Sequence, residues 1–196
     1  MQIKLNKILI ANRGEIAVRI IRACKEMNIK TVAVYSEADK DALHTKLADE
    51  AICIGPANSK QSYLNIKNII EAANITKADS IHPGFGFLSE NAQFAKICEE
   101  SNIKFIGPKS EVINLLGNKS NSKELMKKEG VPVIPGSEGS IKNLKEAILI
   151  CEKIGYPILL KASAGGGGKG IRVVNSFEEL ETSYNIVKQE AKNSFN

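Results

Sequence analysis

Residues 7–35 read KILIANRGEIAVRIIRACKEMNIKTVAVY, two short apolar runs separated by an amphipathic segment. The runs at residues 7–11 and 31–35 are rich in branched residues, which is typical of strands. Between them, apolar residues recur at helical spacing: Ile16, Ile20, Ala23, Cys24 and Met27. Strand, helix and strand in this order predict parallel strands joined by a right-handed crossover.

The same alternation continues through the first half of the chain. Further strands are expected at residues 51–54, 80–82 and 103–106, and helices over residues 66–73 and 91–100. Ser89 is expected to cap the second of these helices. Residues 3–108 are therefore predicted to form one doubly wound α/β domain.

A dinucleotide site is the first functional hypothesis for such a domain, but its glycine fingerprint is absent. Only Gly14 follows the first strand, where the pattern Gly-x-Gly-x-x-Gly would be needed. Glu37 and Asp39 lie where a ribose-binding acid would be expected, yet acids are also common turn residues. The sequence therefore argues against NAD binding.

A loop rich in glycine and aromatic residues, HPGFGFLSE (residues 82–90), follows the expected strand at residues 80–82. Open α/β sheets usually bind ligands at such strand ends. His82 could serve as a ligand or an acid–base group. No second residue of metal-binding type lies beside it in sequence, which favours a structural role.

The second half contains the segment KASAGGGGKG, residues 161–170. Its short apolar flanks, residues 157–160 and 171–174, predict a strand, a glycine loop and a strand. Consecutive glycines let backbone N–H groups surround phosphate oxygens, and Lys161 and Lys169 would add positive charge. A flexible hairpin is the alternative. A Walker A loop is excluded, because the segment leads into Gly-Ile and a strand rather than Lys-Ser/Thr and a helix.

Helices are also expected around this loop, over residues 111–116, 120–129 and 144–154. A capping box of Ser176 and Glu179 opens a last helix, and the chain stops after it. Two strands need further strands to bury a face of their sheet. We therefore expect the chain to be the N-terminal part of a longer protein.

Composition and charge restrict the class of protein. The 196 residues are 43% hydrophobic and carry a net charge of +5 without a run of like charges, so no nucleic-acid tract is expected. The four cysteines lie in apolar contexts without Cys-x-x-Cys spacing, and we expect buried thiols in a reducing compartment. The N-terminal apolar run is too short for a signal or a membrane span, so a soluble, cytoplasmic protein is expected.

Several stretches together resemble the biotin carboxylase family of the ATP-grasp superfamily. They are ILIANRGEIAVRIIRAC (8–24), YLN (63–65), IHPGFGFLSENAQFA (81–95), FIGP (105–108), GNK (117–119) and GYPILLKASAGGGGKGIRVV (155–174). The resemblance implies a Rossmann-like N-terminal domain, residues 1–112, that does not bind NAD. It implies that residues 113–196 are an incomplete ATP-grasp domain containing most of its small lid.

The resemblance also implies a reaction and partners. ATP, magnesium and bicarbonate give carboxyphosphate, and the carboxyl group then passes to biotin on a carrier protein, for use by a carboxyltransferase. Arg22 and Glu26 match positions of a homodimer contact, although by spacing alone they are an exposed i, i+4 pair. Acetyl-CoA carboxylase of fatty acid biosynthesis is one member; whether acetyl-CoA, propionyl-CoA or pyruvate is finally carboxylated stays open.

By matching positions, the resemblance implies ATP contacts from Lys119, Lys161, Gly165, Gly166, Gly167 and Gly168. The magnesium ligands and the general base are expected beyond residue 196, so no catalytic or metal-binding residue is expected in this chain. Three positions depart from the common pattern: Ala164 replaces a glycine, Phe85 a tyrosine and Lys169 an arginine. The alternatives are a carbamoyl-phosphate synthetase-like or other ATP-grasp ligase, or a non-catalytic nucleotide-binding or dimerisation module.

Overall fold

The computed structural model describes residues 5–117, 119–162 and 170–195. The chain divides into two units, Met1–Asn114 and Leu115–Asn196. Within the described residues, the first unit has a five-stranded sheet and the second a two-stranded sheet.

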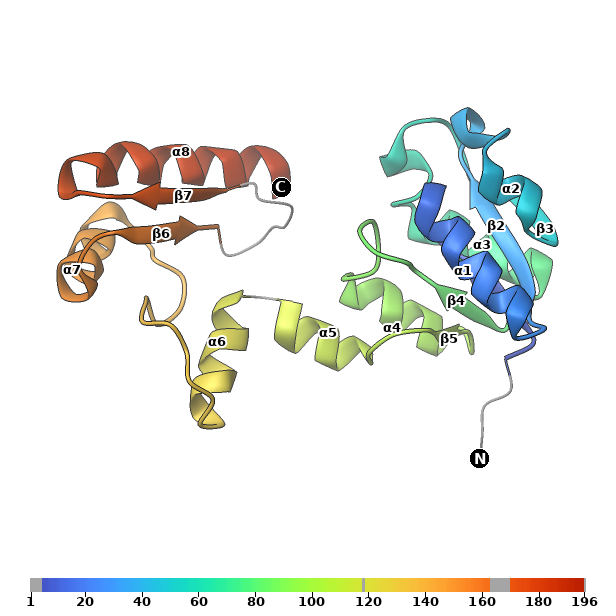
Figure 1. The fold of residues 1–196 in the computed structure, drawn as a ribbon, viewed down its shortest axis with the longest axis horizontal. Coiled ribbons are helices and arrows are strands. Elements are labelled where there is room, and N and C mark those ends of the chain that lie inside the picture. Colours follow the sequence, from blue (N-terminus) through green and yellow to red (C-terminus); the bar gives the residue numbers. More distant parts are fainter. Residues whose placement is uncertain (1–4, 118, 163–169, 196) are drawn as a thin grey trace. The chain divides into compact units, whose positions relative to one another are not determined.

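The sheet of the first unit is parallel throughout and has the order β3-β2-β1-β4-β5 (Figure 1). Its strands are β1 (Lys7–Ile10), β2 (Lys30–Tyr35), β3 (Glu50–Cys53), β4 (Ser80–His82) and β5 (Lys104–Phe105). Leu9 of the central strand is paired with Val32 on one side and Ile81 on the other. This is the strand order of a Rossmann-like sheet, so the predicted fold class is confirmed for this unit.

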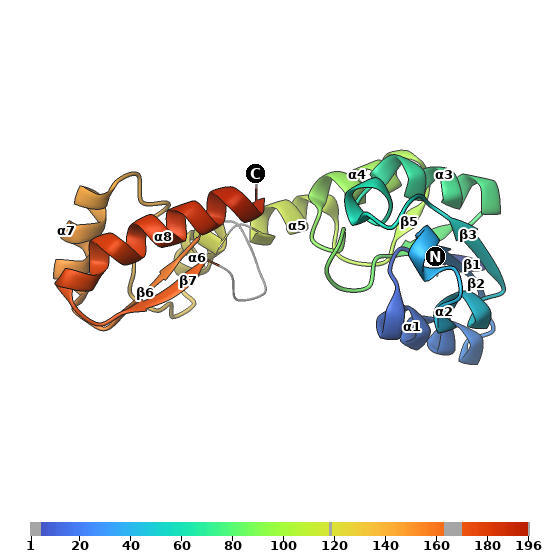
Figure 2. The ribbon, with the colours of Figure 1, turned by 90° about the horizontal axis from the view of Figure 1, so that it is seen from above.

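Helices cover both faces of this sheet. They are α1 (Gly14–Glu26), α2 (Leu43–Leu47), α3 (Ile66–Thr76) and α4 (Ala92–Glu100), with short 3-10 turns η1 (Glu37–Asp39) and η2 (Ser59–Gln61). Figure 2 shows α1 and α2 on one face and α3 and α4 on the other. This double winding is the arrangement that the alternating sequence pattern predicted.

Two details of these helices differ from the sequence-based expectation. Met27 is 66% exposed because α1 ends at Glu26, and the buried residues of α1 are Ala17, Ile20, Ile21 and Cys24. The residue that caps α4 is Asn91, not Ser89, because the Asn91 side chain accepts a hydrogen bond from the Phe94 N–H at 2.9 Å.

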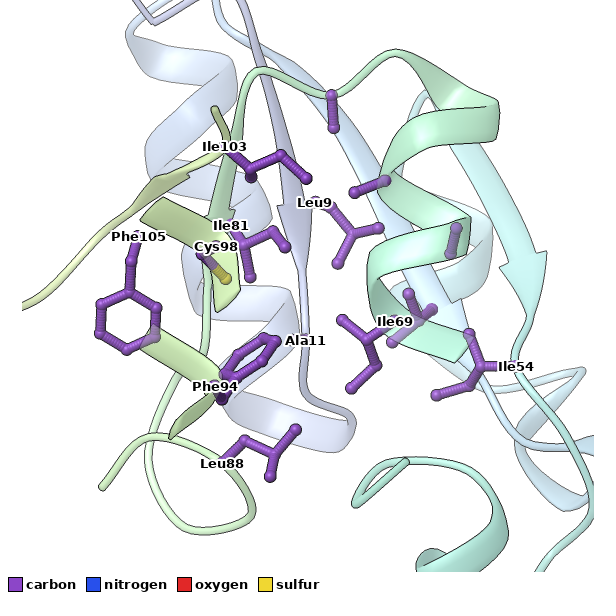
Figure 3. Close-up of a cluster of buried hydrophobic side chains, with 14 of the residues drawn as sticks. Leu9, Ala11, Ile54, Ile69, Ile81, Leu88, Phe94, Cys98, Ile103 and Phe105 are labelled. Carbon is purple, nitrogen blue, oxygen red and sulfur yellow. The ribbon is translucent and has the colours of Figure 1, made fainter. Parts of the chain in front are cut away.

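The main core lies between the sheet and the helices α3 and α4 (Figure 3). Phe94 of α4 is fully buried, and its ring meets that of Phe105 edge to face at a centroid distance of 5.9 Å. Leu9 and Ile81 reach the same cluster from the two central strands. Residues from helices and strands thus form one continuous apolar layer.

A carboxylate, Asp49, fastens the start of β2 to the segment before β3. It accepts hydrogen bonds from the Thr31 N–H at 2.9 Å and the Thr31 hydroxyl at 2.8 Å, and it pairs with Lys30. Partial burial alone would raise the pKa of Asp49, but these donors outweigh it and lower the pKa to about 2. The folded state therefore binds a proton at Asp49 less readily than the unfolded state.

The stability contributed by Asp49 should be present above pH 4 and be lost as the pH falls from 3.8 towards 2, because the folded pKa is the lower one. Since the side chain is 30% exposed, we discount the effect for solvent screening. Asp49→Asn should lower the free energy of unfolding at pH 7 by about 1 kcal/mol and flatten its decline in this pH range. Urea denaturation from pH 7 to pH 2 measures the free energy of unfolding and its pH dependence. Equal pH profiles for the two proteins would contradict a lowered pKa of Asp49 in the folded state.

Three of the four cysteines, Cys24, Cys98 and Cys151, are buried as expected. The expectation is wrong for Cys53, which is exposed. Cys53 ends β3, and β3 is an edge strand, so an apolar sequence context did not guarantee cover on that side.

The second unit contains an antiparallel pair, β6 (Ile158–Lys161) and β7 (Ile171–Val174), on either side of the glycine segment. The predicted strands on both flanks are therefore confirmed. The helices from residue 110 onward are α5 (Ser110–Gly117), α6 (Lys119–Lys128), α7 (Leu144–Ile154) and α8 (Phe177–Phe195). A small core joins α7, the two strands and α8 through Cys151, Leu160, Val174, Leu180 and Val187. Among the described helices, none is both long and apolar enough to cross a membrane.

Candidate functional site

The two faces of the β6–β7 hairpin differ sharply. Leu159 pairs with Val173 and Lys161 with Ile171, so these four side chains share one face. All four are exposed, Leu159 by 48% and Val173 by 60%. We call this set the open face.

The opposite face of the hairpin is covered by α8. Leu160 and Val174 are buried there, and the Arg172 guanidinium reaches Glu190 of α8 at 2.6 Å. Among the described residues, α7 and α8 contribute to the core on this face, and the apolar residues of the open face are not part of that core. Apolar side chains exposed together in this way are typical of a binding surface.

The chemistry of the open face suits a nucleotide. Three apolar side chains offer a flat contact for a base, and Lys161, the last residue of β6, offers an ammonium group at the end nearest the glycine segment. The Ala162 N–H donates to the Gly170 carbonyl at 2.8 Å and extends the ladder by one step towards that segment. A nucleotide whose base packs on the apolar residues could direct its phosphates towards Lys161.

The structure places only one predicted ATP-binding side chain. Lys161 is exposed on the open face. Lys119 is the first residue of α6, but its side chain is outside the described part of the structure, as are residues 163–169 with all four predicted glycines, Gly165 to Gly168. The roles of Lys119 and the glycines stay predictions.

A second polar cluster lies at the carboxyl edge of the parallel sheet, where loops follow β1, β2 and β4. Asn12 follows β1 and is buried. Its side-chain amide donates to the carbonyls of Pro83 and Phe85, both at 2.8 Å. The His82 Nδ1 accepts from the Gly84 N–H at 3.0 Å, and burial lowers the pKa of His82, so the ring is neutral and holds the loop. The geometry agrees with a structural role for His82.

The loop approaches Asn12 so closely that residue 84 must be glycine. Gly84 has a φ of +67°, and a Cβ there would lie 2.7 Å from the Asn12 amide nitrogen. Gly84→Ala should lower the free energy of unfolding by about 2 kcal/mol or more, through backbone strain and the lost amide hydrogen bonds. Thermal or urea denaturation measures the change. Gly86→Ala is the matched comparison, since Gly86 has a φ of +66° but a Cβ there would have no atom within 4 Å. If both variants lose equal stability, the close contact between residue 84 and Asn12 does not contribute to the loss.

A network of three side chains lies beside these loops: Arg13, which follows β1, Asp39, which follows β2, and Tyr63. The fully buried Tyr63 donates its hydroxyl to Asp39 at 2.7 Å and accepts from the Ser36 N–H at 3.0 Å. Burial, followed by the Asp39 carboxylate, raises the pKa of Tyr63. Burial would raise the pKa of Asp39, but hydrogen bonds from Tyr63, Ser36 and Arg13 outweigh it and lower that pKa. Asp39 is therefore an ionised acceptor for a neutral phenol.

The sequence analysis missed this network. Asp39 was considered as a ribose ligand or a turn residue, whereas its carboxylate accepts hydrogen bonds from Ser36 and Tyr63 and pairs with Arg13. A usable signal was present, since Arg13 and Asp39 each follow shortly after a predicted parallel strand. Polar residues at these points meet at one edge of the sheet.

Comparisons with known proteins show the family of this chain. The family described as biotin carboxylase, N-terminal domain, matches residues 4–113. The family described as carbamoyl-phosphate synthase L chain, ATP binding domain, matches residues 118–196. Biotin carboxylase 1 of Bacillus subtilis is 59% identical over 191 residues, which are 97% of this chain and 42% of that protein.

Two solved structures are similar over almost the whole chain. The biotin carboxylase–β,γ-ATP complex from Campylobacter jejuni has a TM-score of 0.95 at 55% identity, covering 98% of this chain and 43% of that one. The biotin carboxylase domain dimer of Hydrogenobacter thermophilus 2-oxoglutarate carboxylase, in complex with MgADP, ADP and bicarbonate, has a TM-score of 0.95 at 52% identity, covering 99% and 43%.

A Rossmann-like sheet followed by an ATP-binding segment of this kind defines an α/β protein of the ATP-grasp class. The N-terminal family match alone includes more than half of the residues. The chain belongs to the biotin carboxylase family, as its sequence motifs predicted. It spans somewhat less than half the length of these relatives.

Proposed function

We propose that this chain supplies the N-terminal domain and part of the ATP site of a biotin carboxylase. The observation that carries the proposal is the open face, an apolar surface ending at Lys161, in a chain of this family. In the proposed reaction a bicarbonate oxygen attacks the γ-phosphorus of ATP, and ADP leaves. The carbon–oxygen bond of the resulting carboxyphosphate then breaks, and its carboxyl carbon forms a bond to N1′ of biotin on a carrier protein. The released phosphate takes the N1′ proton.

The proposed ATP site consists of Lys119, Lys161 and the glycines Gly165, Gly166, Gly167 and Gly168. Phosphoryl transfer depends mainly on positioning and on neutralising charge, which ammonium groups and backbone N–H groups provide. A glycine segment that closes over the phosphates would also exclude water from carboxyphosphate. Among the described residues, no cluster of three His, Cys, Asp or Glu residues could hold a metal ion, and no step of the proposal uses a metal held by them.

We further propose that residues 1–112 form the Rossmann-like domain and residues 113–196 the first part of the ATP-grasp domain. A homodimer is supported by the Hydrogenobacter domain dimer. The family resemblance would place its contact at Arg22 and Glu26 of α1, which with Leu43 help to line a groove of about 760 Å³. A biotin carrier and a carboxyltransferase would complete the pathway in the cytoplasm. The carboxyl group of carboxybiotin could pass to acetyl-CoA for fatty acid synthesis. The relative from 2-oxoglutarate carboxylase shows that family members also serve other carboxylases.

The proposal is tested by measuring ADP release from MgATP by the complete enzyme. We expect release to require both bicarbonate and biotin, and ¹⁴C from bicarbonate to appear in carboxybiotin. Release that requires ammonia or glutamine instead would favour a carbamoyl-phosphate synthetase-like ligase. ATP binding without release under any of these conditions would favour a binding or dimerisation module.

A further inference from the structure

The β6–β7 hairpin has one further hydrogen bond beyond its last strand pair. The Ala162 N–H donates to the Gly170 carbonyl at 2.8 Å, directly after the pair formed by Lys161 and Ile171. A two-stranded hairpin is marginally stable by itself, and backbone hydrogen bonds open most readily at the ends of its strands. The position of Lys161 therefore depends on what holds this last hydrogen bond in place.

A carboxylate of α8, that of Glu190, contacts both Gly170 and Arg172. Its Oε2 accepts a hydrogen bond from the Gly170 N–H at 3.3 Å, and its Oε1 lies 2.6 Å from Nη2 of Arg172. Gly170 thus donates to Glu190 through its N–H and accepts from Ala162 through its carbonyl. This glycine links the carboxylate of the helix to the end of the strand that carries Lys161.

The core of the second unit fixes the place of Glu190. Val187 is buried in that core three residues before Glu190, so both side chains lie on the face of α8 that is turned towards the hairpin. Arg172 lies on the matching face of the hairpin, paired with the buried Leu160. Because each oxygen of the carboxylate has its own donor, two hydrogen bonds set the orientation of Glu190.

A surface ion pair alone would not indicate a functional role. The Arg172 and Glu190 side chains are 45% and 38% exposed, and pairs of this kind contribute little to stability. Glu190 is distinguished by its additional bond to the backbone and by its location. Another glutamate of α8, Glu179, accepts from the Asn175 N–H at 2.9 Å at the opposite end of β7. Of these two glutamates, Glu190 is the one at the end with Lys161.

We propose that Glu190 is a positioning residue for ATP: through Gly170 it fixes the end of the hairpin, so that the Lys161 ammonium group is held where the phosphates bind. This inference rests on the proposed function, which assigns ATP to the open face and Lys161. A cation that is ordered before the ligand arrives costs less to immobilise on binding. Glu190 lies on the α8 side of the hairpin, opposite the open face, and acts on ATP only through Lys161.

The first test compares Glu190→Ala with Glu179→Ala in the complete enzyme, using free biotin as the second substrate. Glu179→Ala is the matched control, because it also removes a glutamate of α8 that accepts from a backbone N–H. We expect Glu190→Ala to raise KM for ATP about five- to tenfold and to change KM for biotin less than about twofold. The control should change neither value. An unchanged KM for ATP, or an equal rise for biotin or in the control, would overturn the inference.

A conservative substitution separates the position of the hairpin from the charge of the carboxylate. Glu190→Gln removes the negative charge but keeps an oxygen that can accept from the Gly170 N–H and from Arg172. We therefore expect its KM for ATP to stay within about twofold of that of the unmodified enzyme. If Glu190→Gln raises this KM as much as Glu190→Ala does, the charge near Arg172 decides the effect, and the proposed route through Gly170 is wrong.

Hydrogen–deuterium exchange of the complete enzyme without ligand keeps the inference independent of turnover. We expect the Ala162 amide to exchange about fivefold faster or more in Glu190→Ala, because its hydrogen bond to Gly170 opens more often, and at an unchanged rate in Glu179→Ala. If the enzyme shows no biotin-dependent turnover but the exchange responds in this way, the proposed function fails while Glu190 still fixes the hairpin. If turnover is present and the exchange does not respond, the inference fails alone.

Discussion

Replacing Lys161 with alanine should lower kcat/KM for ATP in the biotin-dependent reaction by about 100-fold, equivalent to about 2.7 kcal/mol of transition-state stabilisation. Lys161 is exposed on the open face beside Ile171, at the end of β6 that leads towards the glycine segment. No ion pair to Lys161 is found among the described residues. A steady-state assay of ADP release at varied ATP measures the loss.

The matched control is Lys188→Ala, which removes an exposed lysine of α8, the helix on the other side of the hairpin. This variant should retain kcat/KM within about twofold, because exposed charges away from a site have small effects. Equal losses for both variants would mean that general positive charge, not the position of Lys161, matters for ATP.

Replacing Phe94 with alanine should lower the free energy of unfolding of the first unit by about 3–5 kcal/mol. The Phe94 side chain is fully buried between α4 and the sheet, and its ring contacts that of Phe105. The substitution removes this contact and leaves a cavity in a layer that also contains Leu9 and Ile81. Urea denaturation followed by circular dichroism measures the change.

Ile75→Ala serves as the comparison for this stability experiment. Ile75 lies on α3 in the same unit but is largely exposed, so its replacement should change the free energy of unfolding by about 0.5 kcal/mol or less. A loss for Phe94→Ala no larger than that for Ile75→Ala would contradict the position of the core shown in Figure 3.

The elements of the first unit were largely predictable because short apolar runs alternate with amphipathic segments. β1, α1 and β2 agree with the expectation within a residue or two at each end. Finer details depended on tertiary structure: the exposure of Cys53 was not predictable, since the sequence does not reveal that β3 lies at the edge of the sheet. The α4 cap at Asn91 rather than Ser89 depended on where the preceding loop ends.

The candidate sites were predictable to different degrees. Lys161 could be found from the glycine segment and the family resemblance, but its apolar partners emerged only from the register of β6 with β7. The Arg13 network joins residues from three segments that are distant in sequence, Arg13, Asp39 and Tyr63, and only the strand order brings them together. Side-chain contacts of this kind are set by packing, which periodicity does not report.

The most direct test of a nucleotide on the open face is calorimetric titration of MgATP into the complete enzyme, comparing the unmodified protein with Leu159→Asp and Leu149→Asp. Both leucines are exposed in the second unit, but Leu159 lies on the open face beside Val173, whereas Leu149 lies on α7. A carboxylate at position 159 would repel the phosphates and remove apolar contact with the base. We expect saturable binding by the unmodified protein, at least about tenfold weaker binding by Leu159→Asp, and unchanged binding by Leu149→Asp. Equal affinities for all three proteins, or no binding by the unmodified one, would contradict a nucleotide site on this face.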